Sequence, residues 1–260
     1  IDSITGLLRT GEYHTAPMPV ISYRGRIWRA VECARSNTDI WGKRYSAMII
    51  SAPDSADLLQ AASWSVTDSL PYDSTYLDGK FGAWLEGNAV VTPDGNVADL
   101  LRVDYAPGPE YAALIRLRDS VSFDPFDPEK NFVRMPGGAK KFTVRYDSLS
   151  GRYWSLVNYV TQEWAGKQNP AWVRNTLALS SSPNLQEWTV HRTVLHHPDI
   201  AKHGFQYADW LFDGNDIVLL SRTAYDDNGT GAHNCHDANY MTFHRIKDFR
   251  KALTEQAGNR

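Results

Sequence analysis

Four polar residues in the first half of the chain have the chemistry of an acid–base site: His14, Glu32, Glu86 and Arg102. Glycoside hydrolysis commonly uses two carboxyl groups, one to protonate the leaving oxygen and one as base or nucleophile. Glu32 and Glu86 can fill these roles where burial or neighbours raise the pKa of one of them. His14 can replace either as general acid or base, because the pKa of histidine lies near neutrality. Arg102 can hold a carboxylate by two parallel hydrogen bonds.

The same residues also have a purely structural interpretation. The segment 86–88 (Glu-Gly-Asn) can satisfy backbone groups inside a ring of strands, and Glu32 can pair with Arg29 or Lys43. Binding without catalysis is a third alternative. The sequence leaves all three open.

A second concentration of polar residues lies near the C-terminal end, beside segments that otherwise consist of core residues. Its members are His203, Gln206, Tyr207, Asp209, Arg222, Tyr225, His233, His236 and Asp237. They can form a hydrogen-bonded structural cluster, a sugar-binding face or a metal site. His203, His233 and His236, with Cys235, carry enough donor atoms for zinc, but their spacing matches no standard zinc motif. No cofactor is therefore expected, and a structural zinc or calcium ion is the alternative. His196 and His197 precede a proline and are expected in a loop.

Further residues are candidates for holding a substrate. Lys140 and Lys141 follow a Pro-Gly-Gly turn, and since neighbours in a strand face opposite ways, only one of them is expected to reach a uronate. Trp41, Trp84, Trp164 and Trp172 can offer aromatic faces to sugar rings or can pack in the core. The predicted substrate-binding residues are Lys43, Trp84, Asn88, Lys140, His203, Gln206, Arg222, Tyr225 and His233.

The elements that must position these side chains are strands, which dominate from end to end. A glycine-containing tight turn followed by an apolar strand recurs at Gly25, Gly95, Gly151 and Gly214. Asp-Gly and Gly-Asn pairs favour hairpin turns because they tolerate positive φ. Repeats of this length are typical of β-propeller blades with inserted loops. The chain is therefore predicted to be all-β, with about four blades in a single domain over residues 1–260.

Smaller features agree with this interpretation. The segment 182–188 (Ser-Pro-Asn-Leu-Gln-Glu-Trp) is similar to the structural Asp-box turn of sialidase-like propellers, with Asn in place of Asp. Residues 1–16 are expected to be the end of an earlier blade. Short helices are expected at Asp57–Ala62 and Asp248–Gln256.

Composition narrows the classes of function. The net charge is −3, with no long basic run, so a nucleic-acid partner is not expected. No apolar stretch approaches the roughly 20 residues of a membrane span, and no membrane partner is expected. Cys33 and Cys235 are far apart and do not make a disulfide framework, so buried free thiols are expected, a bridge being the alternative.

Several segments together resemble a bacterial group of sialidase-like β-propellers. They are Gly11–Pro17, Trp84–Asn88, Lys140–Thr143, His203–Tyr207 and Gly231–Asn239. The resemblance implies a propeller of six or seven blades whose N-terminal blades precede this chain, and a secreted or periplasmic location. Relatives include propeller α-L-rhamnosidases, whose catalytic histidine would lie in the preceding region.

Ulvan lyases are also relatives in this group, and they use two histidines, a tyrosine and an arginine. By resemblance, His14 matches the first histidine and Arg102 the arginine. Glu32 and Glu86 stand where the second histidine and the tyrosine are expected, which argues against ulvan-type elimination.

The resulting expectation is a carbohydrate-active enzyme with an oligo- or polysaccharide partner. The leading hypothesis is a glycoside hydrolase acting at chain ends of an acidic glycan that bears uronate or sialate. The alternatives are a polysaccharide lyase that cleaves next to a uronate and a non-catalytic glycan-binding propeller. A scaffold that binds other proteins is the remaining hypothesis, and it predicts an exposed apolar patch.

Overall fold

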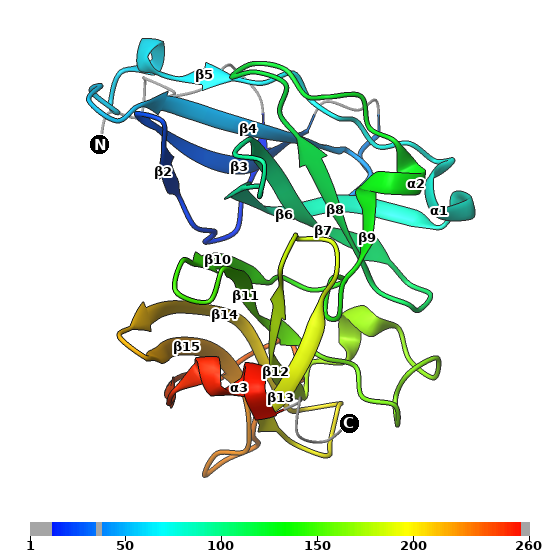
Figure 1. Ribbon diagram of the computed structural model, residues 1–260. Coiled ribbons are helices and arrows are strands. Elements are labelled where there is room, and N and C mark those ends of the chain that lie inside the picture. The colour runs from blue at the N-terminus through cyan, green and yellow to red at the C-terminus, as the bar shows by residue number, and fades with distance from the viewer. Residues whose placement is uncertain (1–11, 35–37, 256–260) are drawn as a thin grey trace. The chain divides into compact units, whose positions relative to one another are not determined.

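The computed structural model describes residues 12–34 and 38–255 (Figure 1). Its strands form antiparallel sheets, and its described helices are short. Internal contacts divide the chain into two compact units. Unit 1 comprises residues 1–104 and 112–133, and unit 2 comprises residues 105–111 and 134–260. Each unit is described by itself, and the predicted single domain stays a prediction.

Unit 1 contains two sheets, the second of which runs to the boundary with unit 2. The first has the order β1-β3-β4-β5, with β2 also paired to β3. Its strands are β1 (Tyr13–His14), β2 (Ile21–Tyr23), β3 (Arg26–Ala34), β4 (Tyr45–Pro53) and β5 (Ser65–Val66). The second has the order β6-β7-β8-β9. Its strands are β6 (Phe81–Val91), β7 (Val97–Tyr105), β8 (Tyr111–Arg116) and β9 (Phe132–Arg134). The short helices are η1 (Ala61–Ser63), α1 (Tyr76–Gly79) and α2 (Pro128–Asn131).

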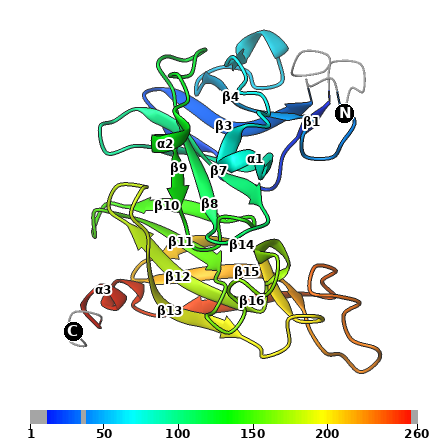
Figure 2. The same cartoon turned by 90° about the vertical axis from the view of Figure 1, so that its right-hand side faces the viewer.

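Unit 2 contains two further sheets, visible in Figure 2 as the green-to-yellow and the orange-to-red strands. The first has the order β10-β11-β12-β13 and the second the order β14-β15-β16. The strands of the first are β10 (Thr143–Asp147), β11 (Arg152–Asn158), β12 (Thr176–Ser182) and β13 (Thr189–His196). Those of the second are β14 (Gly204–Asp213), β15 (Asp216–Ala224) and β16 (Tyr240–Ile246). The short helices are η2 (Pro170–Trp172), η3 (Phe249–Lys251) and α3 (Ala252–Glu255). This up-and-down order is that of a propeller blade.

The four turn glycines lie where the sequence predicts, each at a hairpin that leads into a long strand of a sheet. Their φ angles are +68° at Gly25, +78° at Gly95, +64° at Gly151 and +61° at Gly214. Glycine adopts this left-handed conformation without the Cβ clash that other residues meet. The strands β3, β7, β11 and β15 follow directly, so the predicted repeat of four turn-and-strand units is confirmed.

The segment 182–188 forms the predicted structural turn. The side-chain oxygen of Asn184 accepts hydrogen bonds from the backbone N–H groups of Gln186 and Glu187 at 3.0 and 2.9 Å. The Trp188 indole donates to the carbonyl of Leu185 at 3.0 Å. Asn184 thus performs the task for which aspartate is usual in such turns.

Each unit buries apolar strand residues. In unit 2 one cluster joins β11, β12, β14 and β15 to the C-terminal helices, through Trp154, Leu179, Trp210, Leu219 and Phe249 among others. In unit 1 Val31, Cys33, Met48 and Ile50 form a cluster between β3 and β4. Cys33 and Cys235 are both buried and form no disulfide bond, as expected.

The helix expectations are confirmed in part. The helix η1 (Ala61–Ser63) overlaps only the last two residues of the turn expected at Asp57–Ala62, and the expected C-terminal helix is present as η3 followed by α3. Gln256, the expected last residue of the C-terminal helix, lies outside the described residues. So do residues 1–11, which are most of the segment expected to end an earlier blade. None of the described helices is long and apolar enough to cross a membrane.

Candidate functional site

His14 and Glu32 lie opposite each other on paired strands of unit 1. The register of β1 and β3 pairs their Cα atoms, and Nδ1 of His14 lies 2.9 Å from Oε2 of Glu32. Glu32 is almost fully buried, whereas the His14 side chain keeps 31% of its surface exposed. The hydrogen bond to Glu32 raises the pKa of His14, against the opposing effect of burial; the charges of Glu32 and Glu86 add to the rise. His14 is therefore the member of the pair that solvent reaches.

Glu32 also connects this strand pair to β6. Its second oxygen, Oε1, accepts the backbone N–H of Gly87 at 3.1 Å. The preceding residue, Glu86, has a φ of +56°, which is rare for a residue with a side chain. Oε2 of Glu86 lies 2.8 Å from Nη1 of Arg102 on β7, and both side chains are buried. The structure thus brings together all four residues of the predicted acid–base site, here called the carboxylate network.

Asp99 is a member of this region that the sequence analysis missed. It is fully buried on β7, and both of its carboxylate oxygens lack a hydrogen-bond partner among the described residues. Burial raises its pKa well above the usual range, and the charge of Glu32 raises it further. The carboxyl lies against Gly87, where a Cβ would be 2.2 Å from Oδ1. The signal in the sequence was an aspartate in the middle of an apolar strand, at Val97–Leu101.

The network offers an acid and a base in fixed positions. A proton held by His14 and Glu32 can pass to a leaving oxygen, because His14 is exposed and hydrogen-bonded to a carboxylate. Glu86 has a positively charged partner that occupies one of its oxygens. Because Arg102 already pairs with Glu86, its predicted role as a free clamp for a substrate carboxylate needs correction.

The structural alternatives are resolved in part. Arg29 does not serve Glu32: its guanidinium donates to the backbone carbonyls of Met18 and Ala16 at 3.1 and 3.0 Å. Asn88 is fully buried, and its amide donates to the carbonyl of Leu100 at 3.2 Å. Asn88 therefore holds β6 to β7, and its predicted contact with substrate is corrected.

The predicted aromatic platform at Trp84 is also corrected. Trp84 is fully buried, and its ring stacks on Phe132 with centroids 5.8 Å apart. Its indole N–H donates to the carbonyl of Pro71. The reason is a cluster of rings that covers this face of β6: Tyr76 on α1, Phe126 in the segment before α2, and Phe132 on β9. Lys43 is half-buried, with Nζ 5.5 Å from the centre of the Tyr72 ring. Trp41 is exposed.

Lys140 in unit 2 is buried as well. Its ammonium group lies 2.6 Å from Oε1 of Glu110 and 2.8 Å from the carbonyl of Pro170. Lys141 is also buried and donates to Thr143. The expected uronate contact is therefore corrected, because both lysines are buried. The expected alternation of Lys140 and Lys141 fails because these two residues are not in a strand: β10 begins only at Thr143.

The C-terminal residues separate into two groups within unit 2. Gln206 is fully buried, accepts from Arg174 at 2.7 Å and donates to the carbonyls of Cys235 and His236. Arg222 donates to the same His236 carbonyl at 3.2 Å. This first group ties β14 and β15 to the loop that precedes β16.

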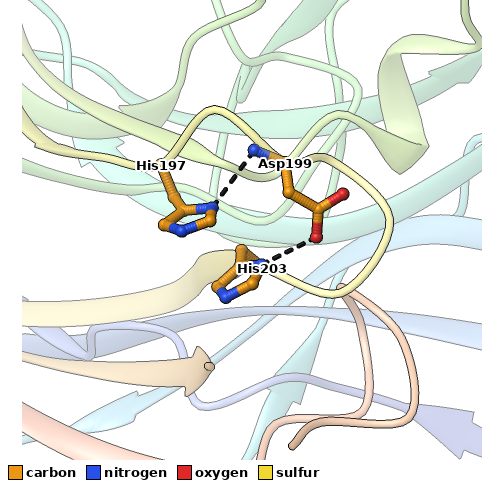
Figure 3. Close-up of side chains that lie close together, drawn as sticks. All are labelled: His197, Asp199 and His203. Atoms are coloured by element: carbon orange, nitrogen blue, oxygen red, sulfur yellow. Dashed lines mark hydrogen bonds and ion pairs between the residues drawn. The ribbon is translucent and has the colours of Figure 1, made fainter. Parts of the chain in front are cut away.

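The second group surrounds His203 (Figure 3). The ring of His203 stacks on His197, with centroids 3.5 Å apart and planes inclined by 17°. Nδ1 of His203 lies 2.7 Å from Oδ2 of Asp199, and Nδ1 of His197 accepts the Asp199 backbone N–H at 3.1 Å. Burial acts to raise the pKa of Asp199, but the hydrogen bonds to it lower that pKa to about 2. Tyr225 packs edge-on against His203. The sequence analysis expected His197 in a loop and did not predict that its ring stacks on His203.

Among the described residues, His197, Asp199 and His203 are the group whose potential ligand atoms lie close enough for a metal ion. The orientation of these ligand atoms does not fit a metal ion. The lone pairs of stacked imidazoles run side by side, whereas zinc requires ligand atoms that point at one centre. The predicted metal set also separates, because His233 is 87% exposed and lies with His236 beside Asp237. Of the predicted C-terminal set, His203 instead belongs to a hydrogen-bonded cluster with His197 and Asp199, two residues that the predicted cluster did not include.

Comparison with known proteins supports the fold. No family model matches the sequence, and no curated protein matches it significantly. Solved structures do match. The Bombyx mori GH32 beta-fructofuranosidase BmSUC1 has a TM-score of 0.52 and 14% identity, over 83% of this chain and 44% of its own. A B. subtilis levansucrase mutant has a TM-score of 0.56 and 10% identity, over 90% and 67%.

A protein of unknown function from Dyadobacter fermentans is similar to the same degree, with a TM-score of 0.53 and 15% identity over 84% of this chain and 64% of its own. The chain thus spans between about two fifths and two thirds of these proteins. At such identities the likeness shows the fold alone. The all-β propeller fold with four blade sheets is confirmed, and the finer resemblance to rhamnosidases and ulvan lyases stays a prediction.

Proposed function

We propose that this protein is a carbohydrate-active enzyme, a glycoside hydrolase that acts on an acidic glycan. The observation that carries the proposal is the carboxylate network. Two buried carboxylates, Glu32 and Glu86, lie in one connected set of hydrogen bonds and charges with the solvent-facing His14. The fold shared with glycoside hydrolases is consistent with it, and fold by itself does not fix chemistry.

In the proposed reaction the His14–Glu32 pair donates a proton to the glycosidic oxygen as the bond to the sugar breaks. The positive charge that develops on the sugar ring is stabilised by the carboxylate of Glu86, either directly or through a covalent bond. Water then completes the hydrolysis, and His14 accepts the proton of that water as it attacks. Arg102 holds the Glu86 side chain in one orientation.

The test is a panel of uronate-bearing glycans, with released reducing sugar and the ultraviolet absorbance of unsaturated uronate followed together. Hydrolysis gives reducing ends without absorbance. Glu32→Gln and Glu86→Gln should each lower kcat by about 100-fold or more, the usual contribution of a positioned acid or base. The matched control is Glu163→Gln, which changes an exposed glutamate of unit 2. Full activity in Glu86→Gln would remove that residue from the mechanism.

One observation favours a lyase as the second candidate. His14 is the partly exposed titratable group of the network, and its hydrogen bond to Glu32 raises its pKa, which suits an imidazole base that removes the proton next to a uronate carboxylate. Elimination would make absorbance rise with the reducing ends. Binding without any turnover would instead indicate a non-catalytic glycan-binding propeller.

A further inference from the structure

Unit 2 contains a strand residue with the same unusual backbone conformation as Glu86. Tyr207 on β14 has a φ of +51°, compared with +56° for Glu86 on β6. Tyr207 lies in a register shift between β14 and β15, with Arg222 on the neighbouring strand, just as Arg102 neighbours Glu86. Residues held in such sparsely populated conformations cluster at ligand-binding and catalytic sites. The repeated backbone therefore directs attention to the surface around Tyr207.

Arg222 is the charged group of this surface. Its guanidinium carbon lies over the Tyr207 ring, 4.8 Å from the ring centre. A single N–H donates to the His236 carbonyl, and no carboxylate of the described residues pairs with Arg222. Its side chain is half-buried. An arginine that lies over a ring and uses one N–H for a backbone carbonyl has further N–H donors for a bidentate contact with a carboxylate.

The surroundings keep this arginine electropositive. The buried guanidinium of Arg174 lies 6.0 Å from the centre of the Tyr207 ring, and it is fixed by its hydrogen bond to Gln206. The neighbouring acid, Asp237, accepts a hydrogen bond from the Asn234 side-chain amide at 2.7 Å, donates its backbone N–H to the Asn234 side-chain oxygen, and is close to two histidines. Hydrogen bonds from Asn234 and with His236 lower the pKa of Asp237, so its charge is engaged within its own loop.

An aromatic face borders the same surface. Trp172 is 55% exposed, and its ring lies edge-on to His236 with centroids 6.5 Å apart. Its position is set by η2, where the Asn169 side chain caps the Ala171 N–H, and by the Cys235 thiol, which donates to the Trp172 carbonyl. An exposed indole held by its backbone offers a flat apolar face at small entropic cost, and the C–H face of a pyranose can stack on it.

We propose that Trp172, Tyr207, Arg222 and His236, the Arg222 site, bind a uronic acid residue of a glycan. Arg222 receives the carboxylate, and Trp172 receives the apolar face of a sugar ring. This inference rests on the proposed function for the class of ligand, a glycan. The inference goes beyond the proposed function because it assigns recognition of the negative charge to unit 2. Arg102 in unit 1 is already paired with Glu86.

The test is isothermal titration of the whole protein with an oligosaccharide of glucuronic acid and with its carboxyl-reduced neutral counterpart. The wild-type protein should prefer the acidic form. Arg222→Gln should weaken binding of the acidic oligosaccharide at least tenfold and leave the neutral one unchanged. Trp172→Ala should weaken both, and as a change at an exposed residue it tests the site even if Arg222→Gln fails to fold.

The matched control is Arg192→Gln. Arg192 is also half-buried, lacks a carboxylate partner and donates to one backbone carbonyl, that of Lys247 at 3.3 Å. The Arg192→Gln variant should bind the acidic oligosaccharide as tightly as the wild-type protein does. Equal affinity in Arg222→Gln and wild type would overturn the inference, and so would absence of binding to wild type or equal affinity for the acidic and neutral forms.

Failure of this inference and failure of the proposed function give different results. Turnover that depends on Glu86, with binding that does not depend on Arg222, would remove the Arg222 site and leave the hydrolase. Binding that depends on Arg222, without turnover of any acidic glycan, would support the site and remove the hydrolase.

Discussion

Gly87 is the residue where one added methyl group should disturb the carboxylate network most. A Cβ at this position would lie 2.2 and 2.7 Å from the two carboxylate oxygens of Asp99 and 2.8 Å from Cβ of Ala30. Ordinary contacts between such atoms are about 3.5–4.0 Å. Asp99 and Ala30 are 0% and 1% exposed, so neither can move into solvent. Strands β3 and β6 must therefore separate in a Gly87→Ala variant.

The expected loss of stability follows from this overlap. Overpacking a buried site typically costs about 1–3 kcal/mol, and we expect a value near the upper end because atoms from two strands are overlapped. Activity should fall as well. The Gly87 N–H holds Glu32 at 3.1 Å, and a displacement of about 1 Å in a catalytic group can cost about 100-fold in rate.

Urea unfolding followed by tryptophan fluorescence measures the first effect, and kcat on the best substrate of the panel measures the second. The double variant Gly87→Ala/Asp99→Ala should recover part of the stability, because it removes two of the three close contacts. Gly229→Ala is the control, since its Cβ meets only the exposed Asp227 carboxylate at 3.3 Å. A Gly87→Ala protein within about 0.5 kcal/mol of wild type, a change typical of surface sites, would refute the packing argument.

Two further predictions concern stability and pH. Hydrogen bonds from Arg250 lower the pKa of Asp147 from 3.8 to about 2. This shift corresponds to about 2 kcal/mol of stability. That stabilisation is present above pH 4 and is lost as the pH falls to 2. Urea unfolding of Asp147→Asn should show this loss at pH 7 and a much smaller difference from wild type at pH 2, and an equal difference at both would contradict the assignment. Asp99 has the opposite sign: its pKa is raised by burial and by Glu32, so the folded state binds the extra proton and stability falls as the pH rises above 4. Unfolding of Asp99→Asn between pH 4 and 8 should lack that decline, and a slope equal to that of wild type would show that Asp99 is not its source.

The repeat of turns and strands could be predicted from the sequence because its causes are local. Asp94-Gly95 and Gly214-Asn215 specify hairpins through the backbone conformations that these residues tolerate, whatever surrounds them. The turn at 182–188 is equally local, since Asn184 satisfies backbone groups two and three residues away. The residue types of the acid–base site, His14, Glu32, Glu86 and Arg102, could also be chosen from chemistry and resemblance.

Only the tertiary structure decided which of the chosen residues meet and which are covered. Glu32 reaches the Gly87 N–H because β3 packs beside β6, a contact across 55 residues that no local pattern encodes. Trp84 and Lys140 were predicted to face ligand, yet a ring cluster covers the first and Glu110 neutralises the second. Strand periodicity gives two faces, and the partner that packs on each face determines which one water reaches. That partner comes from distant sequence, so burial, and with it the raised pKa of Asp99, could be known only from the folded chain.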